Sequence, residues 1–345
     1  MTDLENLEEI KKLDPKNIYG STEMFADQCE QIWQSQISAQ PEYKNINNII
    51  LCGMGGSAYG GYIAQSLYKD NLKVPIYINN DYHLPKYANE NTLIIISSYS
   101  GNTEESLSCL NEAINRKCKI IGLTTGGKLS DILTQNKFPF ILIDPKFNPS
   151  GQPRLGMGYM VLGIIRILNI LELLDFKNDE LLNAVKELRN SRDTIKKKAI
   201  YMAKFLKSYS PLIFSAEFLN GNAHILRNQF NETSKMFSTF SVIPELNHHL
   251  MEGLKFPEVK MMKVLFLTSS LFQDRIKKRI SLTKEVIKSN KIELEEYEPL
   301  GQTPLSQVLN VLSFGGYVTL YLALLYDQDP SLIPWVDYFK QELSK

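Results

Sequence analysis

The chain has 345 residues, 43% of them hydrophobic and 10% aromatic, which is enough to bury a sizeable core in about two domains. Its 38 Lys and Arg residues balance 38 Asp and Glu residues, so the formal net charge is zero. A chain without net charge lacks the broad positive field that binding to a phosphate backbone requires, so nucleic acid is not an expected partner.

The four cysteines show no C-x-x-C spacing and are expected to be free thiols in a reducing compartment. The first nine residues are acidic where a targeting peptide would be basic, and no apolar run is expected to approach the roughly 18 residues of a membrane span. We therefore expect a cytoplasmic protein that does not bind a membrane.

Residues 1–44 predict a helical arm, because apolar side chains recur at helical spacing until Pro41. Residues 45–150 then alternate short apolar segments with helix-length segments, which is typical of a parallel sheet covered by helices on both faces. The predicted strands are Asn48–Cys52, Pro75–Ile78, Thr92–Ile96, Lys119–Leu123 and Pro139–Ile143.

Residues 151–205 predict a helical connector that follows three closely spaced prolines. Residues 206–345 predict a second α/β unit that ends in a helix from Pro334. Its predicted strands are Leu212–Ser215, Val264–Thr268 and Ile292–Tyr297, and a helix is expected over Asp274–Asn290. The sequence thus predicts an α/β protein with two units in tandem.

A glycine-rich turn, Cys52–Gly61, leaves the first strand and opens a helix. Glycines let the backbone approach a ligand, and a helix N-terminus favours an anion. No G-K-[ST] follows, so triphosphate hydrolysis is disfavoured. Gly53, Gly55 and Ala58 fit the dinucleotide-binding pattern G-x-G-x-x-A, and Asp81 could bind the ribose. A nicotinamide-dependent oxidoreductase is therefore one alternative function. A second alternative is that the segment is only a tight turn that binds no ligand.

A hydroxyl-rich loop, Ser97–Glu105, follows the third predicted strand and precedes a helix. Loops after parallel strands meet at one edge of the sheet, so this loop and the glycine-rich turn should form one site. Ser98, Ser100 and Thr103, together with Ser57, offer neutral hydrogen-bond donors to a phosphate monoester. Helix capping would explain one of these hydroxyls but not all of them.

These two loops, G-M-G-G-S and S-Y-S-G-N-T-E-E, resemble the SIS (sugar isomerase) domain, which binds phosphosugars. Later motifs resemble, in order, those of the bifunctional phosphoglucose/phosphomannose isomerase family. They are Pro153-Arg154, Asn231–Lys235, Pro244–His248 and Asp337–Leu343. The resemblance implies two flavodoxin-like SIS subdomains, Gly56 among the phosphate-binding residues, and a homodimer with shared active sites. It also implies a cofactor-free interconversion of glucose 6-phosphate or mannose 6-phosphate with fructose 6-phosphate.

Such an isomerase needs a base that carries a proton between C1 and C2 and a cation near the developing enediolate oxygen. On the family pattern Glu232 is the base and Arg154 stabilises the enediolate. Without the resemblance, Glu232 reads as a solvated helical carboxylate and Arg154 as a surface residue.

Ring opening is assigned by the same resemblance to His248 and Lys340. His249 follows directly where relatives commonly have another residue, so it could share or replace the role of His248. No further ligands stand at a zinc-site spacing from this histidine pair, so neither a metal nor a cofactor is expected.

A second departure is that Gly316 replaces an acid and Val318 a hydroxyl residue of the family pattern. If that hydroxyl helps the enzyme to accept both C2 epimers, its replacement by Val318 would affect the reaction of mannose 6-phosphate. An alternative function is a non-catalytic SIS regulator that binds a phosphosugar, although no DNA-binding helix-turn-helix is evident.

Overall fold

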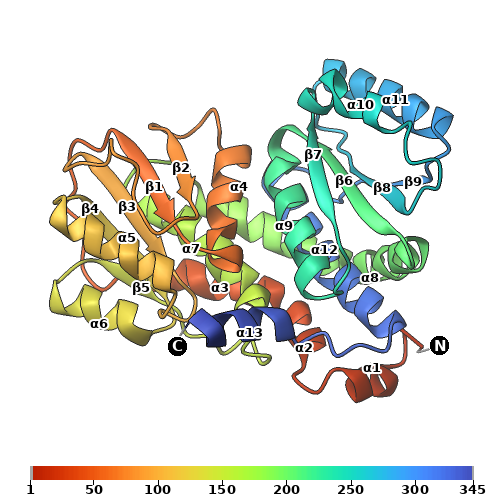
Figure 1. The fold of residues 1–345 in the computed structure, drawn as a ribbon. Helices are drawn as coiled ribbons and strands as arrows, with labels where there is room; N and C mark the ends of the chain where they lie inside the picture. The colour runs from red at the N-terminus through yellow and green to blue at the C-terminus, as the bar shows by residue number, and fades with distance from the viewer. Residues whose placement is uncertain (1–2, 344–345) are drawn as a thin grey trace.

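The computed structural model describes residues 3–343 and shows two α/β units side by side, with the N-terminal helices and the last helix along one side of them (Figure 1). The first unit holds a five-stranded parallel sheet of order β2-β1-β3-β4-β5. Its strands are β1 (Asn48–Cys52), β2 (Ile76–Asn79), β3 (Thr92–Ser97), β4 (Lys119–Thr124) and β5 (Phe140–Leu142).

Helices cover both faces of the first sheet because its central strands are buried on both sides. In β3, Leu93 and Ile95 belong to one hydrophobic cluster, while Ile94 and Ile96 belong to another. The helices on the first side are α3 (Phe25–Gln34), α4 (Tyr59–Leu67) and α7 (Met157–Ile170). The helices on the second side are α5 (Glu104–Asn115) and α6 (Gly127–Gln135).

The second unit holds a four-stranded parallel sheet of order β7-β6-β8-β9. Its strands are β6 (Ser210–Ala216), β7 (Thr239–Ile243), β8 (Met262–Leu267) and β9 (Leu294–Tyr297). Its helices are α8 (Asn178–Leu206), α9 (Asn220–Glu232), α11 (Asp274–Ser289) and α12 (Pro304–Leu325). The expected α/β class with two parallel sheets is confirmed, although β7 was not predicted.

Helix α12 corrects the expectation that no apolar run is long enough for a membrane span. The helix has 22 residues, and an 18-residue window within it has a mean hydropathy of 1.8, but this whole window is buried inside the protein. It lies against α8 and α9 and is therefore the core helix of the second unit. Length and composition alone do not distinguish a membrane-spanning helix from a buried core helix. The fold distinguishes them, because it shows that α12 is buried.

The units are joined mainly through α4 and α9, which pack against each other. Shorter elements complete the chain: α1 (Leu7–Leu13), α2 (Ile18–Glu23), α10 (Leu250–Gly253) and α13 (Pro334–Leu343). Within residues 3–343, four 3-10 turns precede or connect helices: η1 (Gly55–Ala58), η2 (Pro153–Leu155), η3 (Glu217–Leu219) and η4 (Glu245–His248). All four cysteines are free and buried, as expected for thiols that form no disulfide.

Candidate active site

The glycine-rich turn after β1 is shaped by close backbone approaches. A Cβ atom on Gly53 would lie 2.9 Å from the carbonyl oxygen of Ser97, and one on Gly56 would lie 3.3 Å from Cα of Arg154. Gly55 opens η1 with φ +49°, a left-handed conformation that favours glycine. The turn therefore brings the backbone of η1 against both the β3 loop and the η2 turn that carries Arg154.

The hydroxyl-rich loop after β3 is crosslinked by its own side chains. Ser98 Oγ lies 2.8 Å from Thr103 Oγ1 and accepts a hydrogen bond from the Gly101 N–H. Ser57 Oγ accepts a hydrogen bond of 3.0 Å from the Tyr99 N–H. Ser57 and Ser98 are buried and hold the two predicted phosphate loops in register.

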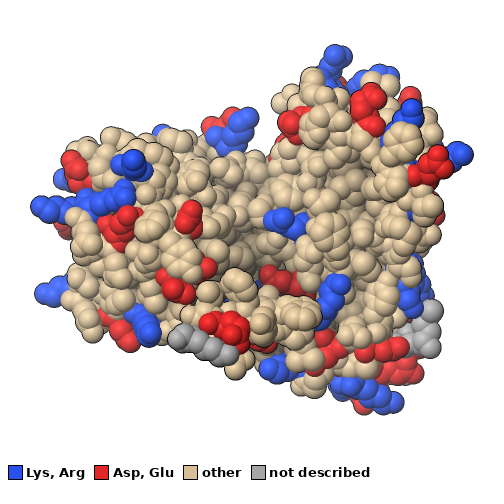
Figure 2. Space-filling model, viewed as in Figure 1, with Lys and Arg blue, Asp and Glu red and all other residues tan. Residues whose placement is uncertain are grey.

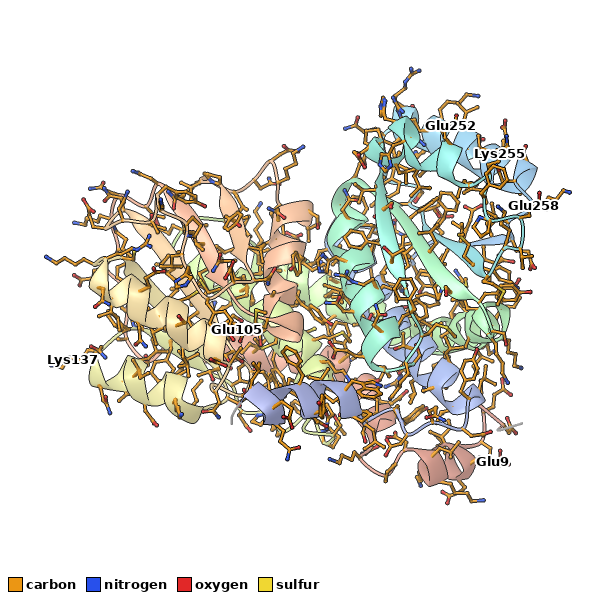
Figure 3. All side chains as sticks on the ribbon, viewed as in Figure 1. Glu9, Glu105, Lys137, Glu252, Lys255 and Glu258 are labelled. Atoms are coloured by element: carbon orange, nitrogen blue, oxygen red, sulfur yellow. The ribbon has the colours of Figure 1, made fainter. Side chains whose placement is uncertain are left out.

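Ser100 and Thr103 line a pocket of about 710 Å³ that is closed on its other side by α13. Trp335, Phe339 and Lys340 of α13 face this pocket together with Glu105, which Figure 3 labels on α5 near α13. No residue of α13 is buried. The helix therefore covers the predicted phosphate loops without being packed into a core.

Glu232 is the last residue of α9, and its carboxylate lies beside the same loops. Its Oε2 atom is 4.0 Å from Nε of Arg154, and the position that a Cβ atom on Gly55 would take is 3.8 Å from its Oε1 atom. Burial raises the pKa of Glu232 above its ordinary value, while the charges of Arg154 and Lys340 act in the opposite direction. About a third of the side chain, 32%, stays exposed, so this carboxylate is accessible from solvent.

Arg154 is buried in η2 and holds the segment between α12 and α13. Its Nη2 atom donates to the carbonyl oxygens of Pro330 and Ser331, both at 2.9 Å, and Nη1 donates to Gln152 Oε1 at 3.0 Å. Its Nε atom is buried and has no hydrogen-bond partner among the described residues. One guanidinium thus faces the Glu232 carboxylate and fixes the chain that leads to Lys340.

Lys235 is a site residue to which the sequence reading gave no role. Its Nζ atom donates to the carbonyl oxygens of Thr233 at 3.0 Å and Asp329 at 2.8 Å, so it ties the end of α9 to the same segment that Arg154 holds. Burial and the nearby charge of Arg154 lower the pKa of Lys235 to about 8. Its place in the quoted N-E-T-S-K motif, three residues after Glu232, was the available signal.

The structure does not bring the histidine pair to this group. His248 ends η4 and is exposed, and His249 binds Glu245 at 2.9 Å. The turn leads directly into α10, at the opposite end of the second unit from α13 (Figure 1). In Figure 3, Glu252 marks α10 at the top of the second unit, while α13 lies near Glu105 of the first unit.

Gly316 and Val318 lie inside α12, the buried helix of the second unit. Val318 is fully buried, and a Cβ atom on Gly316 would lie 2.9 Å from Thr22 Cγ2. The role of these positions in the choice between epimers stays a prediction. In the part of the chain that the structure describes, no group of three or more His, Cys, Asp and Glu side chains could hold a metal ion.

On the visible face, acidic and basic side chains are interspersed, and no large area carries one sign of charge (Figure 2). A tandem sugar isomerase (SIS) domain protein is defined by the loops after β1 and β3, their hydroxyl side chains, and a half-buried carboxylate beside a buried guanidinium. The family model of the bacterial phosphoglucose isomerase C-terminal SIS domain matches residues 195–343. The chain belongs to the bifunctional phosphoglucose/phosphomannose isomerase family.

Relatives named bifunctional phosphoglucose/phosphomannose isomerase match most of the chain. The one from Caldicellulosiruptor bescii is 32% identical over 323 residues, which covers 90% of this chain and 93% of the relative. The one from Aquifex aeolicus is 29% identical and covers 96% of this chain and 99% of the relative.

Solved structures share the fold at lower sequence identity. A hypothetical protein from Thermus thermophilus matches with a TM-score of 0.76 at 14% identity, over 98% of this chain and 94% of that one. Tagatose-6-phosphate ketose/aldose isomerase from Escherichia coli matches with a TM-score of 0.65 at 13% identity, over 95% of this chain and 96% of that one.

Proposed function

We propose that this protein is a cofactor-free aldose-ketose isomerase that interconverts glucose 6-phosphate, and also mannose 6-phosphate, with fructose 6-phosphate. The observation that carries the proposal is the position of Glu232, a carboxylate of raised pKa placed between the Arg154 guanidinium and the loops after β1 and β3. Family membership supports the choice of hexose 6-phosphates as substrates.

The phosphate binds at the loops that contain Gly56, Ser57, Ser98, Ser100 and Thr103. The loop N–H groups and the hydroxyls of Ser100 and Thr103 supply donors without a fixed positive charge. Lys340 on α13 approaches the sugar from the opposite side of the pocket.

The proton transfer uses one carboxylate in both directions. Once the ring is open, Glu232 takes the proton from C2 of the aldose, and the C2–H electron pair forms the C1–C2 double bond of the enediolate. Arg154 stabilises the negative charge that develops on the C1 oxygen. The hydroxyl proton then moves from the C2 oxygen to the C1 oxygen, the C2 carbonyl forms, and Glu232 returns its proton to C1 to give the ketose. The raised pKa suits this role, because the carboxylate must both accept and release a proton near neutral pH.

The ring-opening residues require a second chain. His248 lies at the far end of the second unit from Lys340, so we propose that a homodimer places His248 of one chain in the site of the other. His249 is the alternative at this step. A cytoplasmic location belongs to the same proposal, because hexose 6-phosphates are metabolites of that compartment.

The test is a coupled assay of the EDTA-treated protein with glucose 6-phosphate and mannose 6-phosphate separately, with fructose 6-phosphate as the measured product. Turnover of both substrates is expected. Turnover of glucose 6-phosphate alone would restrict the proposal to one epimer and point to Val318, which Val318→Thr would then examine. Tight binding without turnover of either substrate would favour the regulator.

A further inference from the structure

The two α/β units repeat the same local plan around their first strands. In each unit the first strand lies between two neighbours, β1 between β2 and β3, and β6 between β7 and β8. Each leads through a 3-10 turn, η1 or η3, into α4 or α9. The strands β3 and β8 are followed by loops of equal length, residues 98–103 and 268–273, before α5 and α11 begin. Both units therefore offer a crevice at the carboxyl edge of the sheet.

Glu217 and Gly55 have comparable places in this plan, although Glu217 directly follows β6 and two residues separate Gly55 from the end of β1. Each is the first residue of its 3-10 turn, and their φ angles are +48° and +49°. A glycine adopts this left-handed conformation freely, whereas a glutamate does so at a cost in free energy. The turn of the second unit thus begins with a carboxylate-bearing side chain, whereas the turn of the first unit begins with a glycine.

The Glu217 side chain bridges the two loops of the second unit. Its Oε1 atom accepts a hydrogen bond of 3.3 Å from the backbone N–H of Gln273. Gln273 directly precedes α11, as Thr103 directly precedes α5. The carboxylate is therefore held between the loop after β6 and the N-terminus of α11, where the partial positive charge of the helix favours an anion.

We propose that Glu217 takes the place of a bound phosphate in the second unit, so that each chain binds phosphosugar at the first unit only. The comparison of the two units rests on the phosphate position given under the proposed function. Glu217 also lines a pocket of about 700 Å³ between the units, together with Asn220, Gln273, Tyr62 and His224. Figure 2 shows that the surface is indented between the two units.

The pocket therefore has the size of a ligand site but excludes phosphorylated ligands. A phosphate placed at the start of α11 would displace the Gln273 hydrogen bond and lie against the negative charge of Glu217. The second unit thus keeps a crevice at the edge of its sheet, and Glu217 occupies the helix N-terminus in it to which a phosphate would bind.

The test compares the wild-type chain with Glu217→Gly, which removes the carboxylate and suits the left-handed backbone. The first site is saturated with arabinonate 5-phosphate, an open-chain analogue of the enediolate, and binding of radiolabelled inorganic phosphate is measured by equilibrium dialysis. We expect about one additional phosphate per chain in Glu217→Gly and none in the wild type. Asp70→Asn removes one negative charge from the lining of the same pocket and should bind no phosphate, as the wild type does.

Glu217→Gly that binds no additional phosphate, with a melting temperature at or above that of the wild type, would overturn the inference. Additional phosphate on the wild-type chain or on Asp70→Asn would overturn it as well. Failure of the proposed function is recognised separately, because it appears as a wild-type chain that neither isomerises hexose 6-phosphates nor binds arabinonate 5-phosphate.

Discussion

The Nε atom of Arg154 lies 4.0 Å from Oε2 of Glu232, while Nη2 of the same guanidinium holds the carbonyl oxygens of Pro330 and Ser331. Arg154 thus connects the carboxylate at the end of α9 with the segment that carries α13. Positions of the proposed base and of Lys340 depend on one side chain, although the three residues lie far apart in the sequence. Substitutions at these residues should therefore separate proton transfer from the placement of α13.

Glu232→Gln should abolish isomerisation while leaving the phosphosugar site intact. The amide fills the same volume but cannot accept the C2 proton, so kcat should fall by about 10² to 10⁴-fold. The dissociation constant of arabinonate 5-phosphate, measured by calorimetry, should change far less than kcat. Full activity of this variant would remove Glu232 from the mechanism.

The same variant should also be more stable than the wild type at neutral and alkaline pH. Because the folded protein raises the pKa of Glu232 above its unfolded value, the ionised carboxylate costs stability above the folded pKa. That cost disappears as the pH falls through the folded pKa and below the unfolded one. The difference in melting temperature between Glu232→Gln and the wild type should therefore shrink toward acid pH; a difference that grows there would contradict the assigned shift.

Lys340→Met should shift the pH dependence of catalysis. The charge of Lys340 lowers the pKa of Glu232 against the larger effect of burial, so its removal should raise that pKa further. The acid limb of the kcat/KM profile should move to higher pH, since the base becomes protonated sooner. Lys340→Arg keeps the charge and provides the control. An unchanged acid limb in Lys340→Met would separate Lys340 from Glu232.

Arg154→Lys should loosen α13 as well as weaken catalysis. A lysine keeps the positive charge but lacks the planar fork that reaches Pro330, Ser331 and Gln152 together. Hydrogen exchange of the amides in α13 should accelerate, and kcat/KM should fall by about 10² or more. Lys235→Met, which releases only the Asp329 carbonyl of the same segment, should accelerate exchange while leaving kcat less affected.

The sequence predicted both sheets because buried parallel strands appear as continuous apolar runs, as in Leu93–Ile96. It did not predict β7, an edge strand in which only Ile243 is buried and polar residues interrupt the apolar pattern. The loops after β1 and β3 were placed together by topology alone. The distance between His248 and Lys340 within one chain does not follow from the order of the motifs, although the resemblance implied active sites shared between two chains.

That separation leads to a test of the shared site by mixing two inactive variants. Glu232→Gln and His248→Ala each damage every site of their own homodimer. In a mixed dimer with shared sites, Glu232 of one chain and His248 of the other form one intact site, so unfolding and refolding an equal mixture should restore about one quarter of the wild-type activity. A site built within one chain would give no such recovery. The same mixture with His249→Ala in place of His248→Ala identifies the histidine that opens the ring. If His249→Ala is inactive alone and activity recovers in the mixture, the ring-opening role belongs to His249. If His249→Ala alone is fully active, the role belongs to His248.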